Sequence, residues 1–417
     1  MLPTFTAIKK GEIMSDQQAL TFTRSIQASS AAVYEALTSA TGFREWLSDG
    51  AVVAAAREGG NYQLWWNDGY YTSGEFKTLT ENERVEFTWY GSSEPASTAV
   101  RIDLKPADGG TELIVTHSGL DSDNAWETFA QEIKQGWEAS LENLQSVLET
   151  GTDLRIARRP MLGIIVSQRI TPEIAEKLGL PVTEGVQIGS AIEGMGAEAA
   201  GLTNNDVITR LADTPITNFQ SFAEAVAPYH GGDTVSVEFY RGSEKHLVDM
   251  TLSKRQLPDV PGDPKELAKQ LEGIFDQLFK EIEEIVGGLD DAAASQPPAE
   301  GEWNVKQVLA HLILSDRGTN GWIGSLVSGT EQVNFGGNIN AQVDAVVDVY
   351  PTVSDLLAEL RRTWAEQVAF IARLEKDFTD RKRTYVRLGQ ALLQTAYHPQ
   401  SHHDQLREAI GASTVTA

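Results

Sequence analysis

Three histidines near the end of the chain have the type and spacing that could hold a metal ion. His398 and His402 are four residues apart, so on a continuous helix both imidazoles would leave the same face, one turn apart. A metal ion needs this spacing from two ligands on one helix. His311 stands in an apolar stripe of an earlier predicted helix, where a lone imidazole is costly to bury. An antiparallel neighbour could bring the other two rings to it.

The metal hypothesis has alternatives within the same segment. Pro399 separates the paired histidines and should kink the helix or start its last part. If His398 caps that helix, His403 could replace it as the third ligand. The histidines could also only pack or form hydrogen bonds. Because the chain has no cysteine, any metal must be held by histidine and carboxylate, and a three-histidine site suits zinc, nickel or iron.

The elements that must position these histidines are helices. A Pro-rich linker, residues 256–264, precedes a segment, residues 265–417, with little strand signal. Its apolar periodicity predicts four antiparallel helices, the last of them in two pieces. The predicted helices run over residues 267–285, 304–316, 354–374, and 388–397 continued by 399–410.

Two stretches of this segment, "GEWNVKQVLAHL" and "AYHPQSHHDQL", resemble the DinB superfamily of metal-binding four-helix proteins. The resemblance implies a divalent metal held by His311, His398 and His402, with His403 in reserve and Gln405 as a residue that orients a ligand. Some members of that family are metal-dependent enzymes that use low-molecular-weight thiols. The resemblance therefore also implies an alternative function, a metal-dependent thiol S-transferase or hydrolase.

The middle segment, residues 156–255, alternates short predicted strands with two helices. Its pieces "MLGI", "GVQIGSAIEGMGAEAAGLTNNDVITRLADTPI" and "GGDTVSVEFYRG" resemble a bacterial PDZ domain of the type attached to HtrA proteases. In that family a loop, here Met161, Leu162, Gly163 and Ile164, turns backbone N–H groups toward a peptide's C-terminal carboxylate, and the next strand edge pairs with the peptide. The alternative is a PDZ fold used only for packing.

Two expectations accompany this resemblance. No Gly-x-Ser-x-Gly is present and no protease-like segment precedes the PDZ-like one, so we do not predict a protease. The partner would be the C-terminal peptide of another protein or this chain's own small, apolar end, residues 414–417.

The first segment, residues 20–150, predicts antiparallel strands and a closing amphipathic helix. "SAAVYEALTSATGFREWLSDG", "RVEFTWY", "TELIVTHSGL" and "GWEASLENLQSVLE" resemble the Hsp90-ATPase-activator-like branch of the START/Bet v 1 (SRPBCC) helix-grip superfamily. That fold implies a cavity for an apolar small molecule between sheet and helix. Its candidate walls are Trp46, Trp65, Trp66, Trp89, Trp126 and Trp137. The alternative is that these tryptophans are simply core, and we expect His117 to be structural or on the surface, not catalytic.

Composition limits the class of protein. A chain of 417 residues predicts several domains, and the fold class we expect is multidomain α+β. A net charge of −25 disfavours nucleic acid as a partner, and no apolar run is long enough for a membrane span. Residues 1–19 have no secretory signal pattern, whether the chain starts at Met1 or Met14, so we expect a cytoplasmic protein. The main hypothesis is a multidomain binding protein, and the enzyme is its alternative.

Overall fold

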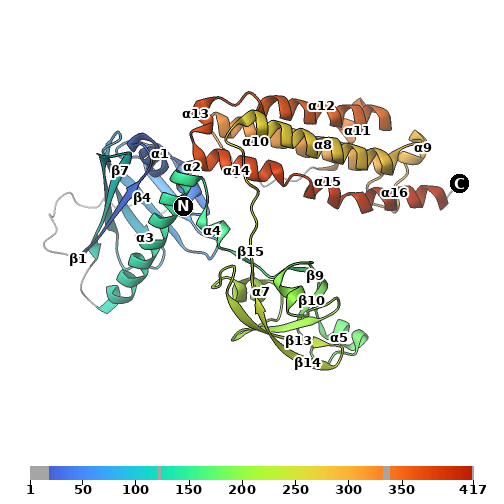
Figure 1. Ribbon diagram of the computed structural model, residues 1–417, viewed down its shortest axis with the longest axis horizontal. Helices are drawn as coiled ribbons and strands as arrows, with labels where there is room; N and C mark the ends of the chain where they lie inside the picture. The colour runs from blue at the N-terminus through green and yellow to red at the C-terminus, as the bar shows by residue number, and fades with distance from the viewer. Residues whose placement is uncertain (1–17, 121–123, 332–338, 416–417) are drawn as a thin grey trace, which may run out of the picture. The chain divides into compact units, whose positions relative to one another are not determined.

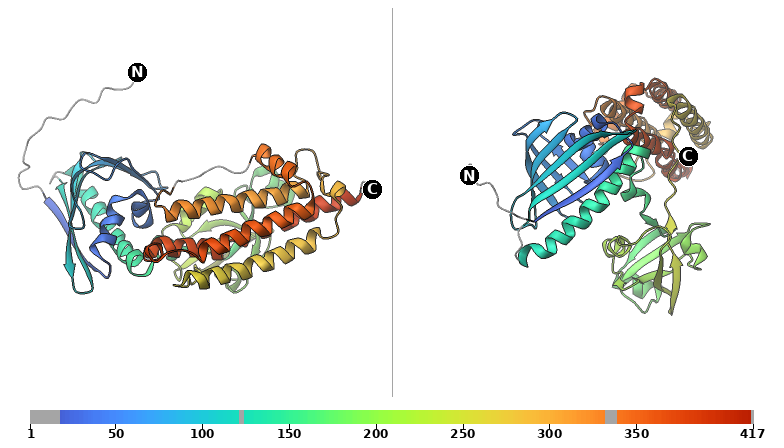
Figure 2. Two further views of the ribbon diagram at one scale, coloured as in Figure 1. Left: turned by 90° about the horizontal axis from the view of Figure 1, so that it is seen from above. Right: turned by 60° about the vertical axis from the view of Figure 1, so that its left-hand side comes forward.

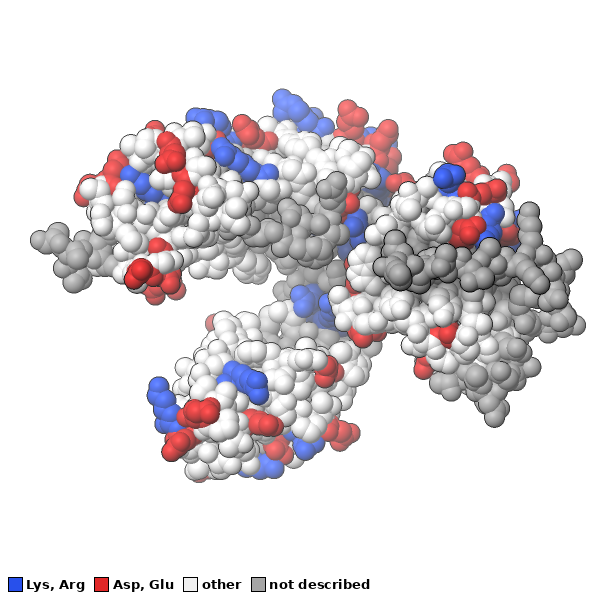
Figure 3. Space-filling view, turned by 180° about the vertical axis from the view of Figure 1, so that it is seen from behind, with Lys and Arg blue, Asp and Glu red and all other residues white. Residues whose placement is uncertain are grey.

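A computed structural model describes residues 18–120, 124–331 and 339–415 of the chain. They form a mixed α+β protein, which confirms the predicted fold class (Figure 1). The chain divides into two compact units, residues 1–152 with 258–417, and residues 153–257. No described helix is both long enough and apolar enough to cross a membrane. On the face drawn in Figure 3, acidic and basic side chains are interspersed, so the negative net charge does not form one patch there.

The first segment is a seven-stranded antiparallel sheet with one long helix, α3 (Asn124–Thr150), along one face (Figures 1 and 2). The strand order is β1-β7-β6-β5-β4-β3-β2. The described apolar residues of α3 that face the sheet, Trp137, Leu141, Leu144 and Val147, recur at the three- and four-residue steps seen in the sequence. The strands are β1 (Gln18–Ile26), β2 (Gly50–Val53), β3 (Asn61–Trp65), β4 (Tyr71–Thr80), β5 (Arg84–Gly91), β6 (Thr98–Ala107) and β7 (Gly110–Leu120).

Two short helices connect β1 to β2. The first, α1 (Ser30–Thr38), begins after Ser29, whose hydroxyl accepts the Ala32 N–H at 3.2 Å and so caps the helix. The second, α2 (Ala40–Trp46), was not expected from the sequence. It is capped by Ser39, and Gly42 lets it turn tightly, because a Cβ there would lie 2.7 Å from the Ala36 Cα.

The middle segment forms a second antiparallel sheet with the order β14-β13-β11-β10-β9 and β12 paired to β11. Strand β9 is therefore an edge strand. The segment contains α4 (Leu154–Ala157), β8 (Pro160–Met161), β9 (Ile164–Ile170), α5 (Pro172–Leu178), β10 (Gly185–Ala191), α6 (Gly196–Ala199), β11 (Val207–Leu211), β12 (Thr214–Pro215), α7 (Phe219–Val226), β13 (Thr234–Arg241), β14 (Glu244–Thr251) and β15 (Ser253–Lys254).

The last segment is helical and shares one apolar core. Three long helices, α8 (Pro264–Val286), α10 (Val305–Val327) and α12 (Val353–Ile371), lie side by side with a fourth, broken layer (Figures 1 and 2). That layer consists of α14 (Lys382–Leu393), α15 (Tyr397–Ser401) and α16 (His403–Val415). Shorter helices complete the segment: α9 (Asp291–Ala294), α11 (Asn340–Val349) and α13 (Lys376–Thr379).

The helix bounds differ most from the sequence expectation in α10 and in the last layer. Helix α10 continues from the expected end at Asp316 to Val327, because Ile323 and Leu326 are also buried in the core. The last layer has three pieces instead of two. The end of the chain that we considered as a ligand for the PDZ-like segment includes Thr416 and Ala417, which lie outside the described residues.

A buried carboxyl group sits inside this helical core. Asp316 of α10 accepts a hydrogen bond from the Trp364 indole nitrogen at 2.7 Å, and the Trp364 ring stacks on Phe275 at 4.8 Å. Burial raises the pKa of Asp316 from its ordinary value to about 7. The protonated form is therefore the one that the folded core favours.

We expect Asp316→Asn to stabilise α10 near neutral pH. The folded pKa is raised, so wild-type stability is complete below the unfolded pKa of 3.8 and falls as pH rises toward 7. Asparagine keeps the acceptor for Trp364 but cannot ionise, so its advantage should grow over this window to on the order of 4 kcal/mol. Opening free energies of α10 from hydrogen exchange at pH 5 and 8 measure it. Equal advantage at both pH values, or a similar gain from the exposed Asp348→Asn control, would contradict the prediction.

Candidate functional site

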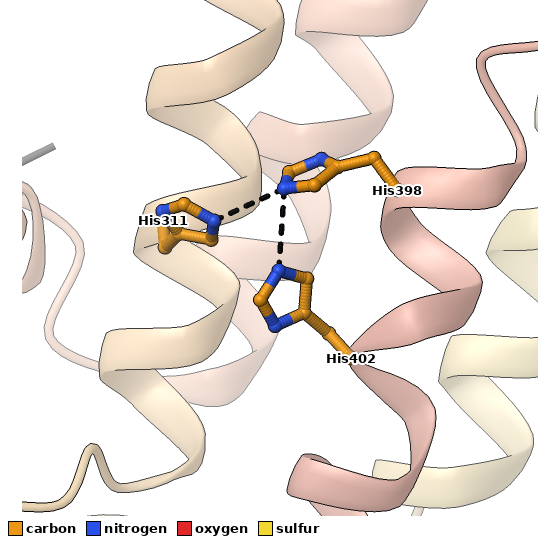
Figure 4. Close-up of side chains that lie close together, drawn as sticks. All are labelled: His311, His398 and His402. Carbon is orange, nitrogen blue, oxygen red and sulfur yellow. Dashed lines mark hydrogen bonds between the residues drawn. The ribbon is translucent and has the colours of Figure 1, made fainter. Parts of the chain in front are cut away.

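Three histidine rings meet between α10 and the broken last layer (Figure 4). The His398 Nε2 lies 3.1 Å from the His311 Nε2 and 3.2 Å from the His402 Nε2. One ring nitrogen from each residue lies within 4.8 Å of the other two. The rings face one another at interplanar angles of 66–86°. The three side chains thus converge edge-on, with nitrogens at the centre.

Local structure explains where the first ring stands. Helix α10 begins at an Asn304 cap, whose side chain accepts the Gln307 N–H while Gln307 reaches back to the Asn304 N–H. His311 follows two turns later, with the Trp303 ring 5.0 Å away. Its flanking residues Ala310 and Leu312 are buried, so the helix is held firmly by the core.

His398 and His402 do not lie on one continuous helix. Of the two arrangements considered from the sequence, the helix broken near Pro399 is the one present. Pro399 lies within the short α15, which ends at Ser401 with His402 as its C-cap, and α16 begins at His403. The backbone nevertheless stays in the right-handed helical region at His402, with φ −93° and ψ −4°. The break therefore shifts the pair only slightly, and both rings still reach His311.

His403, the reserve candidate, points elsewhere. Its Nε2 lies 4.0 Å from a Glu281 carboxylate oxygen on α8, and it is not part of the three-ring cluster. Gln405 lies beside the cluster, since its side-chain oxygen is 2.7 Å from the His402 Nδ1. This contact makes Nδ1 the donor, and the neutral ring then presents its Nε2 lone pair to the cluster.

Burial and the neighbouring rings keep the imidazoles of His311 and His398 neutral. Burial, with smaller contributions from His402 and His398, lowers the pKa of His311 to about 4. The pKa of His398 is also lowered, because its ring is partly desolvated by the surrounding protein, although the residue as a whole is exposed, and because His402 lies beside it. Neutral imidazoles are the form that ligates a metal, so His311 and His398 need lose no proton at neutral pH before binding one.

A second candidate site is a cavity of about 380 Å³ in the helix-grip segment, between α3 and the strands. Among the predicted tryptophans, Trp66, Trp89 and Trp137 line it. Trp46 is buried in the core and donates its indole N–H to the Ala36 carbonyl, and Trp126 packs near Phe129. Trp65 is 37% exposed and points away from the core.

His117 also lines this cavity and is buried. The Trp137 indole N–H donates to its Nδ1 at 2.9 Å, so its Nε2 carries the proton and donates to the Thr98 hydroxyl at 2.7 Å. Burial lowers the pKa of His117 to about 4, which keeps the ring neutral. Both nitrogens are engaged and the ring is buried, which fits the structural one of the two roles expected from the sequence and not a place on the surface.

Tyr70 and Glu94 also line this cavity and were not predicted as site residues from the sequence. Each is separated from the tryptophans by turn residues, and neither belongs to a periodic pattern. The turn-forming sequences around them, Asn67 to Gly69 and Gly91 to Ser93, were the only signal that these side chains sit at strand ends.

The third candidate site is the loop before β9. Gly163 has a left-handed φ of +78°, which turns the chain between Leu162 and Ile164. The Leu162 and Gly163 carbonyls accept the Ala197 and Ile192 N–H groups at 2.9 and 2.7 Å. Within the described residues, the Leu162 and Gly163 N–H groups donate to no acceptor. The loop is therefore anchored by its carbonyls and leaves two donors for a ligand.

Comparison with known proteins divides the chain in the same order. Residues 27–149 match the family described as activator of Hsp90 ATPase homolog 1-like protein, residues 160–252 match the PDZ domain, and residues 251–406 match the DinB superfamily.

Curated relatives cover only part of the chain. A serine protease Do-like HtrA of Lactococcus lactis is 36% identical over 100 residues, which are 23% of this chain and 24% of that protein. A probable periplasmic serine endoprotease DegP-like of Rhizobium meliloti is 30% identical over 125 residues, 30% of this chain and 23% of that protein. The chain thus spans about a quarter of the length of the curated relatives it matches.

Solved structures resemble about a third of the chain. A protein from Chromobacterium violaceum has 23% identity and a TM-score of 0.28, covering 31% of this chain and 96% of its own. The Aha1 dimer from Colwellia psychrerythraea has 21% identity and a TM-score of 0.28, covering 32% of this chain and 96% of its own.

We expect Gly163→Ala to destabilise the unit of residues 153–257. An alanine there would strain the left-handed backbone, and its Cβ would lie 2.2 Å from the Met195 Cβ. The expected cost is about 1–3 kcal/mol in the opening free energy of β9 and β10, measured by hydrogen exchange. Gly189→Ala is the control, because its Cβ would meet nothing closer than 3.5 Å. Equal effects of the two substitutions would refute the prediction.

Proposed function

We propose, from the premise that the chain carries an AHSA1-like, a PDZ and a DinB-like domain in that order, that it is a multidomain binding protein whose DinB-like domain holds a divalent metal ion on His311, His398 and His402. The main support for this proposal is that the Nε2 atoms of three histidine rings lie close together at one point. Ligand nitrogens about 2.0–2.1 Å from one tetrahedral zinc ion lie roughly 3.3 Å apart. The two short nitrogen–nitrogen distances match that value.

Counting protons supports a cation at the centre. If His402 donates from Nδ1 to Gln405, its Nε2 is a bare lone pair. A single N–H on the His398 Nε2 can point well at only one of its two neighbours. If the His398 Nε2 instead accepts a hydrogen bond from His311, its lone pair faces the lone pair of the His402 Nε2, and this second contact is repulsive. Neutral rings cannot satisfy both short contacts, whereas one cation accepts all three lone pairs.

Three imidazoles suit zinc, nickel or iron, and the donor set does not choose among them. Such a metal, when bound with an open coordination position, would polarise a ligand or activate water or a thiol. On the side of this chain, α10 fixes one ring, and Gln405 holds the His402 ring in the tautomer that ligates.

The exposure of His398 favours a second candidate, a metal-dependent thiol S-transferase or hydrolase. His311 and His402 are half-buried, but His398 is exposed, so a small substrate can approach the cluster from solvent. Thiol-dependent turnover by metal-loaded protein that disappears in His402→Ala would favour this candidate over binding alone.

The PDZ-like loop supports a peptide-binding role for the middle domain. Two backbone N–H groups, of Leu162 and Gly163, donate to no described acceptor, and a peptide carboxylate accepts such donors. The next strand, β9, is an edge strand, so an extended peptide can add to the sheet beside it. The ligand is then the C-terminus of a partner protein or of this chain.

The helix-grip cavity supports a small-molecule site in the first domain. It lies between α3 and the sheet, has a volume of about 380 Å³, and is lined largely by aromatic and aliphatic side chains.

We expect the full chain, freed of metal by a chelator, to bind one zinc ion per molecule in isothermal titration calorimetry. His402→Ala should weaken this binding at least about 100-fold, because it removes one of three ligands. Gln405→Ala should weaken it by roughly 10–100-fold, because the ring loses the acceptor that fixes its tautomer.

The matched control for zinc binding is His403→Ala, which removes the neighbouring histidine but leaves the cluster intact. Its affinity should equal that of the wild type. Wild-type affinity in His402→Ala, or an equal loss of affinity in His402→Ala and His403→Ala, would rule out the three-ring site.

For the peptide site, we expect a fluorescent peptide of residues 410–417 to bind the chain lacking residues 414–417. Its C-terminal amide should bind at least about tenfold more weakly in fluorescence polarisation, because the amide carries no charge for the two N–H donors. Equal binding of acid and amide, or no binding of either, would contradict carboxylate capture of this end.

A further inference from the structure

Four of the aromatic side chains that line the helix-grip cavity form a chain of neighbouring rings. The Trp66 ring lies 5.1 Å from Tyr70 and 6.4 Å from Trp89, and the Trp89 ring lies 6.1 Å from Trp137. Neighbouring rings are tilted by 48–52° to one another, so their faces form a curved wall instead of a stack. Aromatic faces carry negative quadrupole charge, and a curved set of them attracts a cation.

A buried carboxyl group stands in this aromatic wall. Glu94 is 8% exposed and lines the cavity. One of its oxygens accepts the Tyr70 hydroxyl at 2.8 Å and the Trp89 indole N–H at 3.1 Å, and the other accepts the Gly91 N–H at 3.2 Å. Glu94 accepts all three of these hydrogen bonds and donates none, which is the arrangement that suits a deprotonated carboxylate.

No cationic side chain among the described residues balances the charge of Glu94. Among the described residues it forms no ion pair, and those that line the cavity include no lysine or arginine. Two further carboxylates, Asp68 and Glu132, line the exposed part of the cavity. An uncompensated buried anion is costly, so a ligand that brings a positive charge would stabilise it.

The other polar groups that line the cavity do not favour a metal ion or an anionic ligand. Both His117 nitrogens are engaged, by Trp137 and Thr98, so this ring offers no lone pair to a metal ion. Anionic ligands would meet three carboxylates and no cationic side chain. A neutral apolar ligand would fill the space but leave the charge of Glu94 unmatched.

We propose that the helix-grip cavity binds a small organic cation, an amine or quaternary ammonium compound, with its charge held against Glu94 and the rings of Trp66, Tyr70 and Trp89. This inference rests on the proposed role of the cavity as a small-molecule site, and it replaces the apolar ligand considered from the sequence with a cationic one. The aliphatic side chains of Leu47 and Ile133, which also line the cavity, pack on the apolar part of the ligand.

The test compares two probes of one shape in calorimetric titrations of the full chain. The cation is benzyl(2-hydroxyethyl)dimethylammonium, and its neutral carbon isostere is 3,3-dimethyl-4-phenylbutan-1-ol. We expect the cation to bind at least about tenfold more tightly, because desolvated cation–π and charge contacts exceed apolar burial alone.

Variants locate the charge that is recognised. Glu94→Gln should weaken the cation about tenfold and change the isostere less than twofold. Because Glu94 is buried and that variant could unfold, the exposed Glu132→Gln is a second test, with an expected loss of about threefold. Glu138→Gln is the matched control, because Glu138 lies on the same helix as Glu132, α3, but does not line the cavity. This variant should bind the cation as the wild type does.

The outcomes separate this inference from the function on which it rests. If the isostere binds as tightly as the cation, the cavity is a small-molecule site but the cationic ligand class is wrong. If neither probe binds, both the ligand class and the proposed small-molecule site are wrong. A cation preference that survives both Glu94→Gln and Glu132→Gln would overturn the assignment of the charge to this cavity.

Discussion

The three histidines meet only because α10 packs against the broken last layer of the helical segment. Leu309 and Leu312 on α10 share one core with Leu406 and Ala409 on α16. Leu309 and Leu312 flank His311 on α10, and Leu406 and Ala409 follow His402 on α16. Burying these residues in one core therefore sets the distance between the rings. Core packing is dense and tolerates little displacement, so it holds the backbones that carry the three rings at a fixed separation.

The described polar groups that are buried illustrate three ways of tolerating low dielectric. Asp316 in the helical core has one donor, Trp364, and its raised pKa favours the protonated acid. His117 is held neutral by a donor on one nitrogen and an acceptor on the other. Glu94 accepts three hydrogen bonds and faces a cavity. Only the last arrangement leaves a charge that a ligand could match, because the other two groups are neutral inside the fold.

Much of the architecture followed from local pattern. The predicted strand runs and closing helix of the first segment, the mixed α+β class and the helical end all agree with the structure. The misses have local causes as well. Helix α2 is short and contains Gly42, so its periodicity was too weak to detect. The far half of α10 contains Gly318, Gly321 and Gly324, which mask a helix that the core stabilises.

The sequence by itself determined the four-residue spacing of His398 and His402, the apolar stripe that carries His311, and the glycine before β9. These are properties of short stretches, where backbone geometry depends on neighbours along the chain. Only the tertiary structure decided that His403 turns toward Glu281, that Trp65 faces outward, and that Glu94 joins the tryptophans of one cavity. Those outcomes depend on which surfaces pack together, and residues brought together by packing leave no periodic trace in the sequence.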